Sequence, residues 1–374
     1  MVSLGAFLSL FHKKNSNTFS EFLKHATVRV SSKTTYPLKD YMKRKEIPLE
    51  DIKLLFENIQ NKDEYLTRFY NTSLKTPDSL IITDTPMKSG HMNNNQYVQY
   101  KNIIRNMFYM EILKYTQSGI ENVPTFLVVL DLLYNHWCID YKILTPSAIH
   151  YMKDRRLGSV FSSFYFRASI MNPYLVYSLN KSVLRGTRIF TPTLGWGSYF
   201  YGFAESGITE YVGTDVINSV CDRMTAFSKT KYPGIDTSLY CVPSEKLAVN
   251  SRFLNKYKNY FDVVFFSPPY YKLELYKGGE QSTSMYKTYE EWLEKYWEKT
   301  IEMCYHVLEK GGKLCYILSG YGSENTKESY DLITDMNRIT KKYFIYKNKQ
   351  PMFNKNVHVS MHRETSEQII LFVK

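Results

Sequence analysis

Cysteine is scarce in this sequence, and its spacing argues against two kinds of site. The 374 residues include five cysteines, an odd number, and no two of them form a C-x-x-C pair. Neither a disulfide framework nor a zinc site is therefore predicted, and no metal is assigned. Few, unpaired cysteines are typical of a reducing compartment, so we expect an intracellular protein.

Long hydrophobic runs are also missing. The stretch from Val2 to Phe11 is apolar but short, has no basic residue ahead of it, and continues directly into His12 and two lysines. A signal peptide begins with a basic segment and a membrane helix needs about 20 apolar residues, so neither is predicted here or elsewhere. We expect a soluble protein without membrane contact, in the cytoplasm or nucleus of a host cell or associated with a virion.

Acidic residues are outnumbered by basic ones. The chain has 36 Asp and Glu against 48 Lys and Arg, a formal net charge of +12 and a pI near 9.1, together with 33 Tyr and 22 Phe. This balance favours a polyanionic partner, with aromatic rings available to stack on bases. Lysine-rich solubility is the simpler alternative. Abundant Lys, Asn and Tyr with little Ala would suit an AT-rich viral or phage genome.

Residues 1–155 are predicted to form a mainly helical N-terminal domain. Pro48 can open a helix with one apolar stripe. The stripe consists of Ile52, Leu55, Phe56 and Ile59. Further helices are expected at 102–115 and 124–140, and a loop rich in Pro, Gly and Asn at 76–96.

Two basic clusters lie in or next to this predicted domain, at 39–45 and 153–156. They favour a domain that binds nucleic acid or a partner protein. The alternative is a packing extension that only covers the rest of the molecule, because charge runs are usually solvated faces.

Residues 156–374 alternate between strand and helix patterns, which predicts an α/β domain around a parallel sheet. The expected strands are 187–191, 210–215, 238–243, 260–266, 313–318 and 368–373. Residues 263–266 are apolar without alternation, which indicates a strand buried on both faces. Aromatic residues at helical spacing over 289–296 indicate a core helix, which we expect to end at Gly311 and Gly312.

The strand at 260–266 stops at two prolines. Pro268 and Pro269 cannot donate ladder hydrogen bonds, so strand pairing ends there and the carbonyl groups of the turn are available to a ligand. The turn reads Ser267-Pro268-Pro269-Tyr270. A polar loop at 272–285 follows, and because a loop of this length inside a compact domain is usually functional, it is a candidate lid.

A glycine pair marks a second turn. Gly195-Trp196-Gly197 follows the strand at 187–191, where small residues let backbone amides approach a ligand at a helix N-terminus. The next strand ends in Asp215, a carboxylate that can accept hydrogen bonds from both ribose hydroxyls of a nucleoside cofactor. Together the two features predict a nucleoside-cofactor site.

The turn at 267–270 matches the (Asp/Asn/Ser)-Pro-Pro-(Tyr/Phe) signature, and the chain resembles the S-adenosylmethionine-dependent amino-methyltransferases, which methylate the exocyclic amine of adenine or cytosine. The resemblance covers about 160–374 and implies S-adenosylmethionine as cofactor. It also implies a Rossmann-like class I methyltransferase sheet that closes with an antiparallel pair of strands. The implied catalytic residues are Ser267, Pro268, Pro269 and Tyr270. The serine oxygen and a proline carbonyl would accept both amine hydrogens, and the tyrosine ring would stack on the base.

The resemblance assigns a cofactor site as well. The family's cofactor loop commonly reads Asp-Pro-x-x-Gly-x-Gly, and Thr191 stands here where an acid is usual, which leaves a degenerate enzyme open. Asn172 and Pro173 lie in a segment similar to the one that meets the methionine carboxylate. Ser244 and Glu245 are placed like the family's adenine contact, with an ordinary strand-end cap as the alternative. The implied cofactor-binding residues are Asn172, Pro173, Thr191, Gly195, Trp196, Gly197, Asp215, Ser244 and Glu245.

The resemblance favours a site-specific DNA methyltransferase acting on adenine N6 or cytosine N4, with the serine leaning toward cytosine. None of the cysteines follows a proline, unlike the nucleophile of cytosine C5 methyltransferases, so covalent catalysis is not expected. Two alternatives stay open: a degenerate nucleic-acid-binding subunit and an RNA base methyltransferase. The expected partner is nucleic acid, DNA before RNA, and a homo- or hetero-oligomer is left open.

Overall fold

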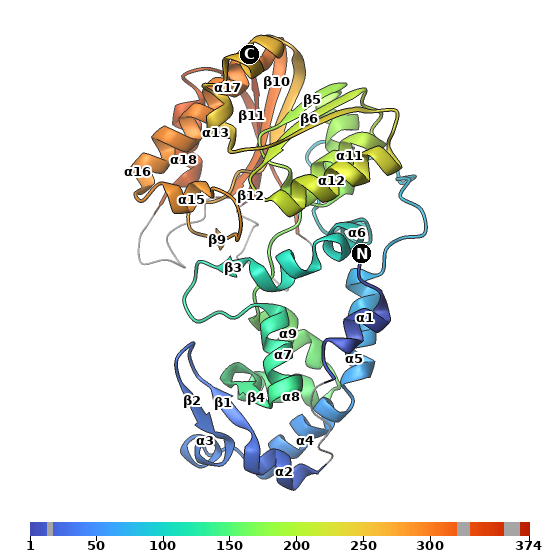
Figure 1. Ribbon diagram of the computed structural model, residues 1–374, viewed down its shortest axis with the longest axis vertical. Helices are drawn as coiled ribbons and strands as arrows, with labels where there is room; N and C mark the ends of the chain where they lie inside the picture. The colour runs from blue at the N-terminus through green and yellow to red at the C-terminus, as the bar shows by residue number, and fades with distance from the viewer. Residues whose placement is uncertain (13–17, 320–329, 355–366) are drawn as a thin grey trace. The chain divides into compact units, whose positions relative to one another are not determined.

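The computed structural model describes residues 1–12, 18–319, 330–354 and 367–374 (Figure 1). In these ranges the chain divides into two compact units. The first contains Met1–Lys75 and Arg105–Ala168, and the second contains Thr76–Ile104 and Ser169–Lys374. No helix in the described ranges is long and apolar enough to cross a membrane.

The first unit is mainly helical. Its helices are α1 (Leu4–Ser9), α2 (Phe19–His25), α3 (Leu38–Lys45), α4 (Leu49–Gln60), α5 (Lys62–Phe69), α7 (Phe126–His136), α8 (Pro146–Lys153) and α9 (Leu157–Phe164), with π-helical or 3₁₀ segments η1 (Tyr70–Leu74), η2 (Glu111–Tyr115) and η3 (Tyr141–Leu144). The apolar stripe predicted for α4 is confirmed, because all four of its residues are buried. The helix predicted at 102–115 is divided into α6 (Tyr100–Met107) and η2.

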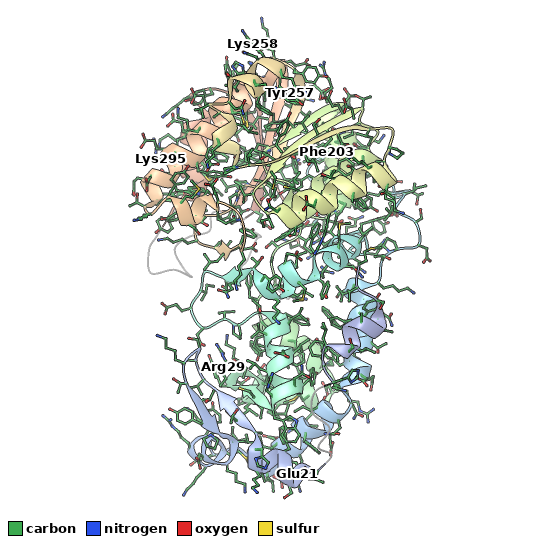
Figure 2. All side chains as sticks on the ribbon, in the orientation of Figure 1. Glu21, Arg29, Phe203, Tyr257, Lys258 and Lys295 are labelled. Carbon is green, nitrogen blue, oxygen red and sulfur yellow. The ribbon has the colours of Figure 1, made fainter. Side chains whose placement is uncertain are left out.

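A small sheet in this unit was not predicted. Strand β1 (Thr27–Arg29) pairs with β2 (Thr35–Pro37) in antiparallel and with β4 (Cys138–Asp140) in parallel orientation. The prediction of one helix over 124–140 is wrong at its end, because Trp137 has a left-handed backbone (φ 50°) that terminates α7 before β4. Arg29, labelled in Figure 2, forms a buried ion pair with Asp140 that joins β1 to β4.

The second unit is built on one sheet of seven described strands. The strands are β5 (Arg188–Thr191), β6 (Glu210–Asp215), β7 (Asp236–Cys241), β8 (Phe261–Phe266), β10 (Leu308–Ser319), β11 (Ile345–Pro351) and β12 (Glu367–Val373). Their order is β11-β12-β10-β8-β5-β6-β7. The five strands from β7 to β10 are parallel, and β12 is antiparallel to both of its neighbours. The predicted Rossmann-like class I sheet, with its closing antiparallel pair, is confirmed.

The centre of this sheet explains why the sequence pattern was readable. Strand β8 lies between β5 and β10, and the four residues 263–266 are each at most 1% exposed. A strand covered on both faces needs apolar side chains throughout, which is the pattern seen. Figure 2 shows Phe203 and Tyr257 within this unit, where both are buried, whereas Lys258 and Lys295 are exposed.

Helices cover the sheet in two groups. The first group comprises α10 (Pro173–Leu179), the π-helical η4 (Asn180–Leu184), α11 (Ser198–Glu205) and α12 (Asn218–Lys231). The second group comprises α13 (Ser244–Leu247), α14 (Ser251–Lys256), α16 (Tyr289–Trp292), the π-helical η6 (Leu293–Glu298), α17 (Lys299–Val307) and α18 (Leu332–Thr340). The aromatic stripe over 289–296 is buried, as predicted for a core helix. That helix ends earlier than expected, at Val307, and Gly311 and Gly312 belong to the irregular start of β10.

The segment 76–104 belongs to the second unit, so the units differ from the predicted domains 1–155 and 156–374. Its residues 76–96 are largely without regular structure, as predicted, and side chains of α10 and α11 hold its backbone. Tyr174 donates a hydrogen bond to the Thr85 carbonyl (2.5 Å), and Tyr201 donates one to the Leu80 carbonyl (2.7 Å). Such long-range bonds leave no signal in a local sequence pattern.

Candidate active site

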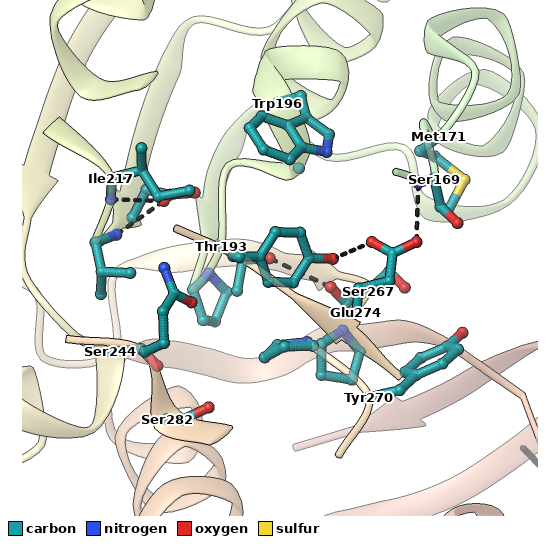
Figure 3. A pocket seen from close by; sticks show the side chains of 18 of the residues that line it. Ser169, Met171, Thr193, Trp196, Ile217, Ser244, Ser267, Tyr270, Glu274 and Ser282 are labelled. Carbon is teal, nitrogen blue, oxygen red and sulfur yellow. Dashed lines mark hydrogen bonds between the residues drawn. The ribbon is translucent and has the colours of Figure 1, made fainter. Parts of the chain in front are cut away.

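A cavity of about 390 Å³ opens at the carboxyl ends of the parallel strands (Figure 3). From β5 the chain proceeds outward to β6 and β7, and then returns to β8 on the other side of β5. Such a reversal is a topological switch point, where α/β sheets bind ligands. The loops that follow β5, β6, β7 and β8 all contribute to the cavity wall, and its volume is in the range of small-molecule sites.

The Ser-Pro-Pro-Tyr turn lies in this wall directly after β8. The Ser267 hydroxyl donates a hydrogen bond to the Ile317 carbonyl on β10 (3.1 Å), so its oxygen lone pairs remain able to accept. In the described part of the chain, no hydrogen bond to the Pro268 carbonyl is found. The turn therefore retains two acceptor groups, the Ser267 oxygen and the Pro268 carbonyl, without an internal donor in the described part of the chain.

Tyr199 on α11 ties this turn to the glycine loop. Its hydroxyl accepts from the Ser267 N–H (3.1 Å) and lies 3.5 Å from the Ser267 carbonyl, which also receives the Thr193 hydroxyl (3.4 Å). A Cβ on Gly195 would lie 2.2 Å from the Tyr199 ring, and Gly195 has a positive φ of 53°. Only glycine fits there, so Gly195 is required for the loop to close over the tyrosine. Burial raises the pKa of Tyr199 to about 12, so the phenol stays neutral.

Asp215, at the end of β6, lines the cavity and holds the neighbouring loops. One carboxylate oxygen accepts from the N–H groups of Val216 (2.8 Å) and Ile217 (3.0 Å), and the other accepts from Leu194 (3.3 Å). Burial raises the pKa of Asp215, and these three hydrogen bonds oppose that shift. The oxygen that accepts only from Leu194 keeps one lone pair free, so the carboxylate can still accept one hydroxyl from a ligand.

Two phenol groups in the cavity wall lack partners. The hydroxyls of Tyr270 and Tyr296 are buried and make no hydrogen bond within the described ranges. Buried polar groups are normally hydrogen-bonded, so unpaired ones at a cavity indicate places where a ligand or water is bound.

Nine of the predicted site residues are brought together in the cavity wall. They are Gly195, Trp196, Asp215, Ser244, Glu245, Ser267, Pro268, Pro269 and Tyr270. Within this group, Ser244 bonds the Thr300 hydroxyl (3.0 Å) and Glu245 accepts from the Tyr286 hydroxyl (3.2 Å). Burial raises the pKa of Glu245. Ser244 and Glu245 are the first two residues of α13, which begins at the edge of the cavity.

Asn172 and Pro173 are not part of the wall. Asn172 is fully buried and caps α10, since its side-chain oxygen accepts from the Tyr174 N–H (3.0 Å) and its amide donates to the Gln96 carbonyl (2.6 Å). Ser169, Ile170 and Met171 of the same segment line the cavity instead, and the contact of Asn172 and Pro173 with a cofactor stays a prediction.

Thr191 and Gly197 also lie behind the wall. Thr191 is fully buried and shares a hydrogen bond with the Tyr211 hydroxyl (2.6 Å), so a threonine–tyrosine pair occupies the place where the resemblance implies a carboxylate. Gly197 begins α11 with a positive φ of 85°, and a Cβ there would lie 2.1 Å from the Met224 sulfur. Both residues shape the loop without reaching the ligand space.

Several polar wall residues were not singled out as site residues from the sequence. They are Asn94, Lys101, Thr193, Glu274, Tyr276 and Glu367. Glu274 and Tyr276 lie in the loop proposed as a lid, so its position after the Ser267–Tyr270 turn was the available signal. Thr193 lies two residues before Gly195 in the predicted glycine loop, whereas Asn94, Lys101 and Glu367 come from distant segments that no spacing in the sequence relates to the turn.

Comparisons with known proteins give only remote similarity. Neither a protein-family model nor a curated protein matches the chain. Among solved structures, the N-methyltransferase NodS from Bradyrhizobium japonicum WM9 is 13% identical, with 54% of this chain and 91% of NodS aligned and a TM-score of 0.34. TrmN from Thermus thermophilus is 12% identical over 55% of this chain and 49% of TrmN, with a TM-score of 0.37. A putative methylase, HI0767 from Haemophilus influenzae, is 11% identical over 53% of this chain and 92% of HI0767, with a TM-score of 0.31.

Similarity at this level does not establish a shared function. The fold assignment rests on the strand order and on the position of the cavity, both of which are properties of this chain.

Proposed function

We propose that this chain transfers a methyl group from S-adenosylmethionine to the exocyclic amine of a nucleobase in DNA, at adenine N6 or cytosine N4. One observation carries the proposal. The Ser267–Tyr270 turn ends a central strand at the switch point and shares a single cavity with Asp215 and the Gly195-Trp196 loop.

The donor set of the cavity fits the proposed cofactor. Asp215 can accept a ribose hydroxyl, Glu245 is a second acceptor at the next strand end, and the unpaired Tyr296 hydroxyl is available to a polar group. When bound, S-adenosylmethionine supplies a methyl group on a sulfonium, and the C–S bonding pair stays on sulfur as the amine nitrogen bonds to the carbon. The protein's contribution is to position the amine and make it nucleophilic.

An aryl amine is a weak nucleophile because its lone pair is delocalised into the ring. The Ser267 oxygen and the Pro268 carbonyl would accept its two hydrogens, which favours a tetrahedral nitrogen with a localised lone pair. One of these hydrogens leaves as a proton after transfer. The amine of a base inside a duplex is out of reach, so the base is extruded into the cavity beside Tyr270.

Replacing Tyr270 by alanine should weaken both nucleic-acid binding and turnover, because a stacking face is worth about 1–3 kcal/mol per base. Phenylalanine at the same position should restore most of the loss, because it keeps the stacking face and lacks only the hydroxyl. Anisotropy titrations and methyl-transfer rates on the three proteins give the comparison. A phenylalanine variant as impaired as the alanine variant would mean that the hydroxyl, and not the ring, is the active part.

Polyanion binding is proposed for the exposed basic face of α3. This face consists of Lys39, Lys43, Arg44 and Lys45. Changing its three lysines to glutamine should lower the slope of log affinity against log salt by about 0.9 for each lost phosphate contact. The control carries the same charge change at exposed Lys229, Lys231 and Lys258. Equal slopes for the two triple variants would exclude a specific role for α3. Deleting 1–155 is a poorer test, since 76–104 belongs to the other unit.

A nucleic-acid-binding protein without the chemistry is the second candidate, favoured by Thr191 in place of the usual acid. RNA is the alternative substrate. Incubation with methyl-labelled S-adenosylmethionine and either DNA or RNA separates the three, because label in DNA supports the proposal, label in RNA alone supports the RNA enzyme, and binding without label supports the second candidate.

A further inference from the structure

Glu274 is a buried carboxyl in the cavity wall that none of the preceding roles explains. It follows the Ser267–Tyr270 turn in the chain, and the residue is 6% exposed. One of its oxygens accepts from the Ser169 N–H (2.9 Å) and the other from the Tyr276 hydroxyl (2.5 Å), as Figure 3 shows. Both donors are neutral, and no ion pair to Glu274 is found in the described part of the chain.

The surroundings of Glu274 favour its neutral form. Burying an unpaired carboxylate is expensive, and such a group usually takes up a proton instead. Burial raises the pKa of Glu274, and the bonds from Tyr276 and Ser169 oppose the shift. Burial also raises the pKa of Glu367, against a hydrogen bond from Asn354 and the charge of Lys101, and the charge of Glu274 adds a smaller upward shift. The second carboxyl therefore lies close enough to Glu274 to be affected by its charge.

The position of Glu274 relates it to both the Ser267–Tyr270 turn and the glycine loop at 195–197. On one side, the Leu273 N–H donates to the Tyr270 carbonyl (3.2 Å), so Glu274 continues directly from the catalytic turn. On the other side, its partner Tyr276 lies with its ring 5.8 Å from the Trp196 ring in the glycine loop. The carboxyl is therefore part of the wall that surrounds the space proposed for the base.

We propose that Glu274, as a neutral carboxyl, donates a hydrogen bond to the ring nitrogen next to the amine of the extruded base. This nitrogen is N1 in adenine and N3 in cytosine. The inference rests on the proposed function and deepens it by giving the site a preference among bases. Guanine and uracil carry an N–H at the corresponding ring position, so their N–H donor would face the O–H donor of Glu274 without an acceptor between them. A protonated carboxyl has one O–H to give while its oxygens still accept from Ser169 and Tyr276.

The competing explanation is structural: the sole role of Glu274 is to connect residues 169–171 to the loop at 272–285 through its hydrogen bond from Ser169. Glutamine at 274 keeps the shape, an acceptor for Ser169 and an N–H for the base, so it preserves both roles. Alanine removes both. Because each substitution preserves or removes both roles together, a variant alone cannot separate the two explanations. The test therefore also changes the ring nitrogen of the base.

The experiment measures binding of 2′-deoxynucleosides to the full chain by calorimetry, with wild type, Glu274→Gln and Glu274→Ala. Each amino base is compared with an analogue in which the ring nitrogen is replaced by C–H, 1-deaza-2′-deoxyadenosine or 3-deaza-2′-deoxycytidine. Nucleosides carry no phosphate, so electrostatic binding elsewhere does not contribute. Wild type should bind the better of the two natural nucleosides at least about tenfold more tightly than its analogue. The glutamine variant should retain that ratio, and the alanine variant should lose it.

A purely structural Glu274 would leave the ratio unchanged in every variant that folds, which overturns the inference. Loss of the ratio in the glutamine variant would also overturn it, because the glutamine amide supplies an N–H donor at the same place. If wild type methylates nucleic acid but does not distinguish the deaza analogues, the inference fails while the proposed function stands. If it neither binds a nucleoside nor transfers methyl, both fail.

Discussion

Replacing Ser267 by alanine should lower kcat by roughly 10²-fold, the scale seen when one group that stabilises a transition state is removed. The hydroxyl oxygen faces a cavity and its own proton is directed to the Ile317 carbonyl (3.1 Å), so its lone pairs are available to the amine. This interaction strengthens as the nitrogen becomes tetrahedral. Substrate and cofactor affinity should therefore change far less than turnover.

Single-turnover rates and calorimetric titrations of the cofactor test this expectation. Ser282→Ala is the matched control, because Ser282 also presents a hydroxyl at the cavity, where it accepts from the Trp292 indole N–H (3.2 Å). The control should keep most of its turnover. If both variants lose activity equally, or Ser267→Ala loses none, the assignment of Ser267 to the amine is wrong.

Among the variants proposed here, Asp215→Ala should produce the largest loss of affinity for S-adenosylmethionine. Each ribose hydroxyl left without its acceptor costs about 1–3 kcal/mol, or roughly ten- to a hundredfold in Kd. The carboxylate also accepts from Leu194, Val216 and Ile217, so the variant loses part of the loop that forms the site. The effect should exceed that of one missing hydrogen bond alone.

Two controls separate these contributions. Asp215→Asn keeps the shape and one oxygen acceptor, so its affinity should lie between wild type and the alanine variant. Asp236→Ala removes an exposed carboxylate at the opposite end of β7 and should leave binding unchanged. Unaltered affinity of Asp215→Ala for S-adenosylmethionine, measured by calorimetry, would mean that the cofactor binds elsewhere.

The sheet was predictable because its strands carry strong local signals. The observed bounds of β6, Glu210–Asp215, are those predicted, and β8 starts one residue after the expected 260–266. Apolar runs that end in Pro, Gly or Asp identify both the strand and the ligand side of the sheet. For this reason the Ser267–Tyr270 turn and Asp215 could be assigned to strand ends before any contact was known, and both line the cavity.

What the sequence missed depends on contacts between distant segments. Asn172 is a polar residue before a proline, a pattern that fits a ligand contact and a helix cap equally well, and here it caps α10. The attachment of 76–104 to α10 and α11 relies on side-chain bonds to its backbone. Glu274 gains its environment from Ser169 and Glu367, which lie far from it in the chain.

The most direct test of the account is to incubate the protein with methyl-labelled S-adenosylmethionine and DNA, digest the DNA to nucleosides, and identify the labelled one by chromatography and mass. Ser267→Ala, checked for unchanged cofactor binding, is the negative control. We expect label in N6-methyldeoxyadenosine or N4-methyldeoxycytidine with wild type, and almost none with the variant. Label on a ring carbon, or DNA binding with no label in any nucleoside, would contradict an amine methyltransferase built on the Ser-Pro-Pro-Tyr turn.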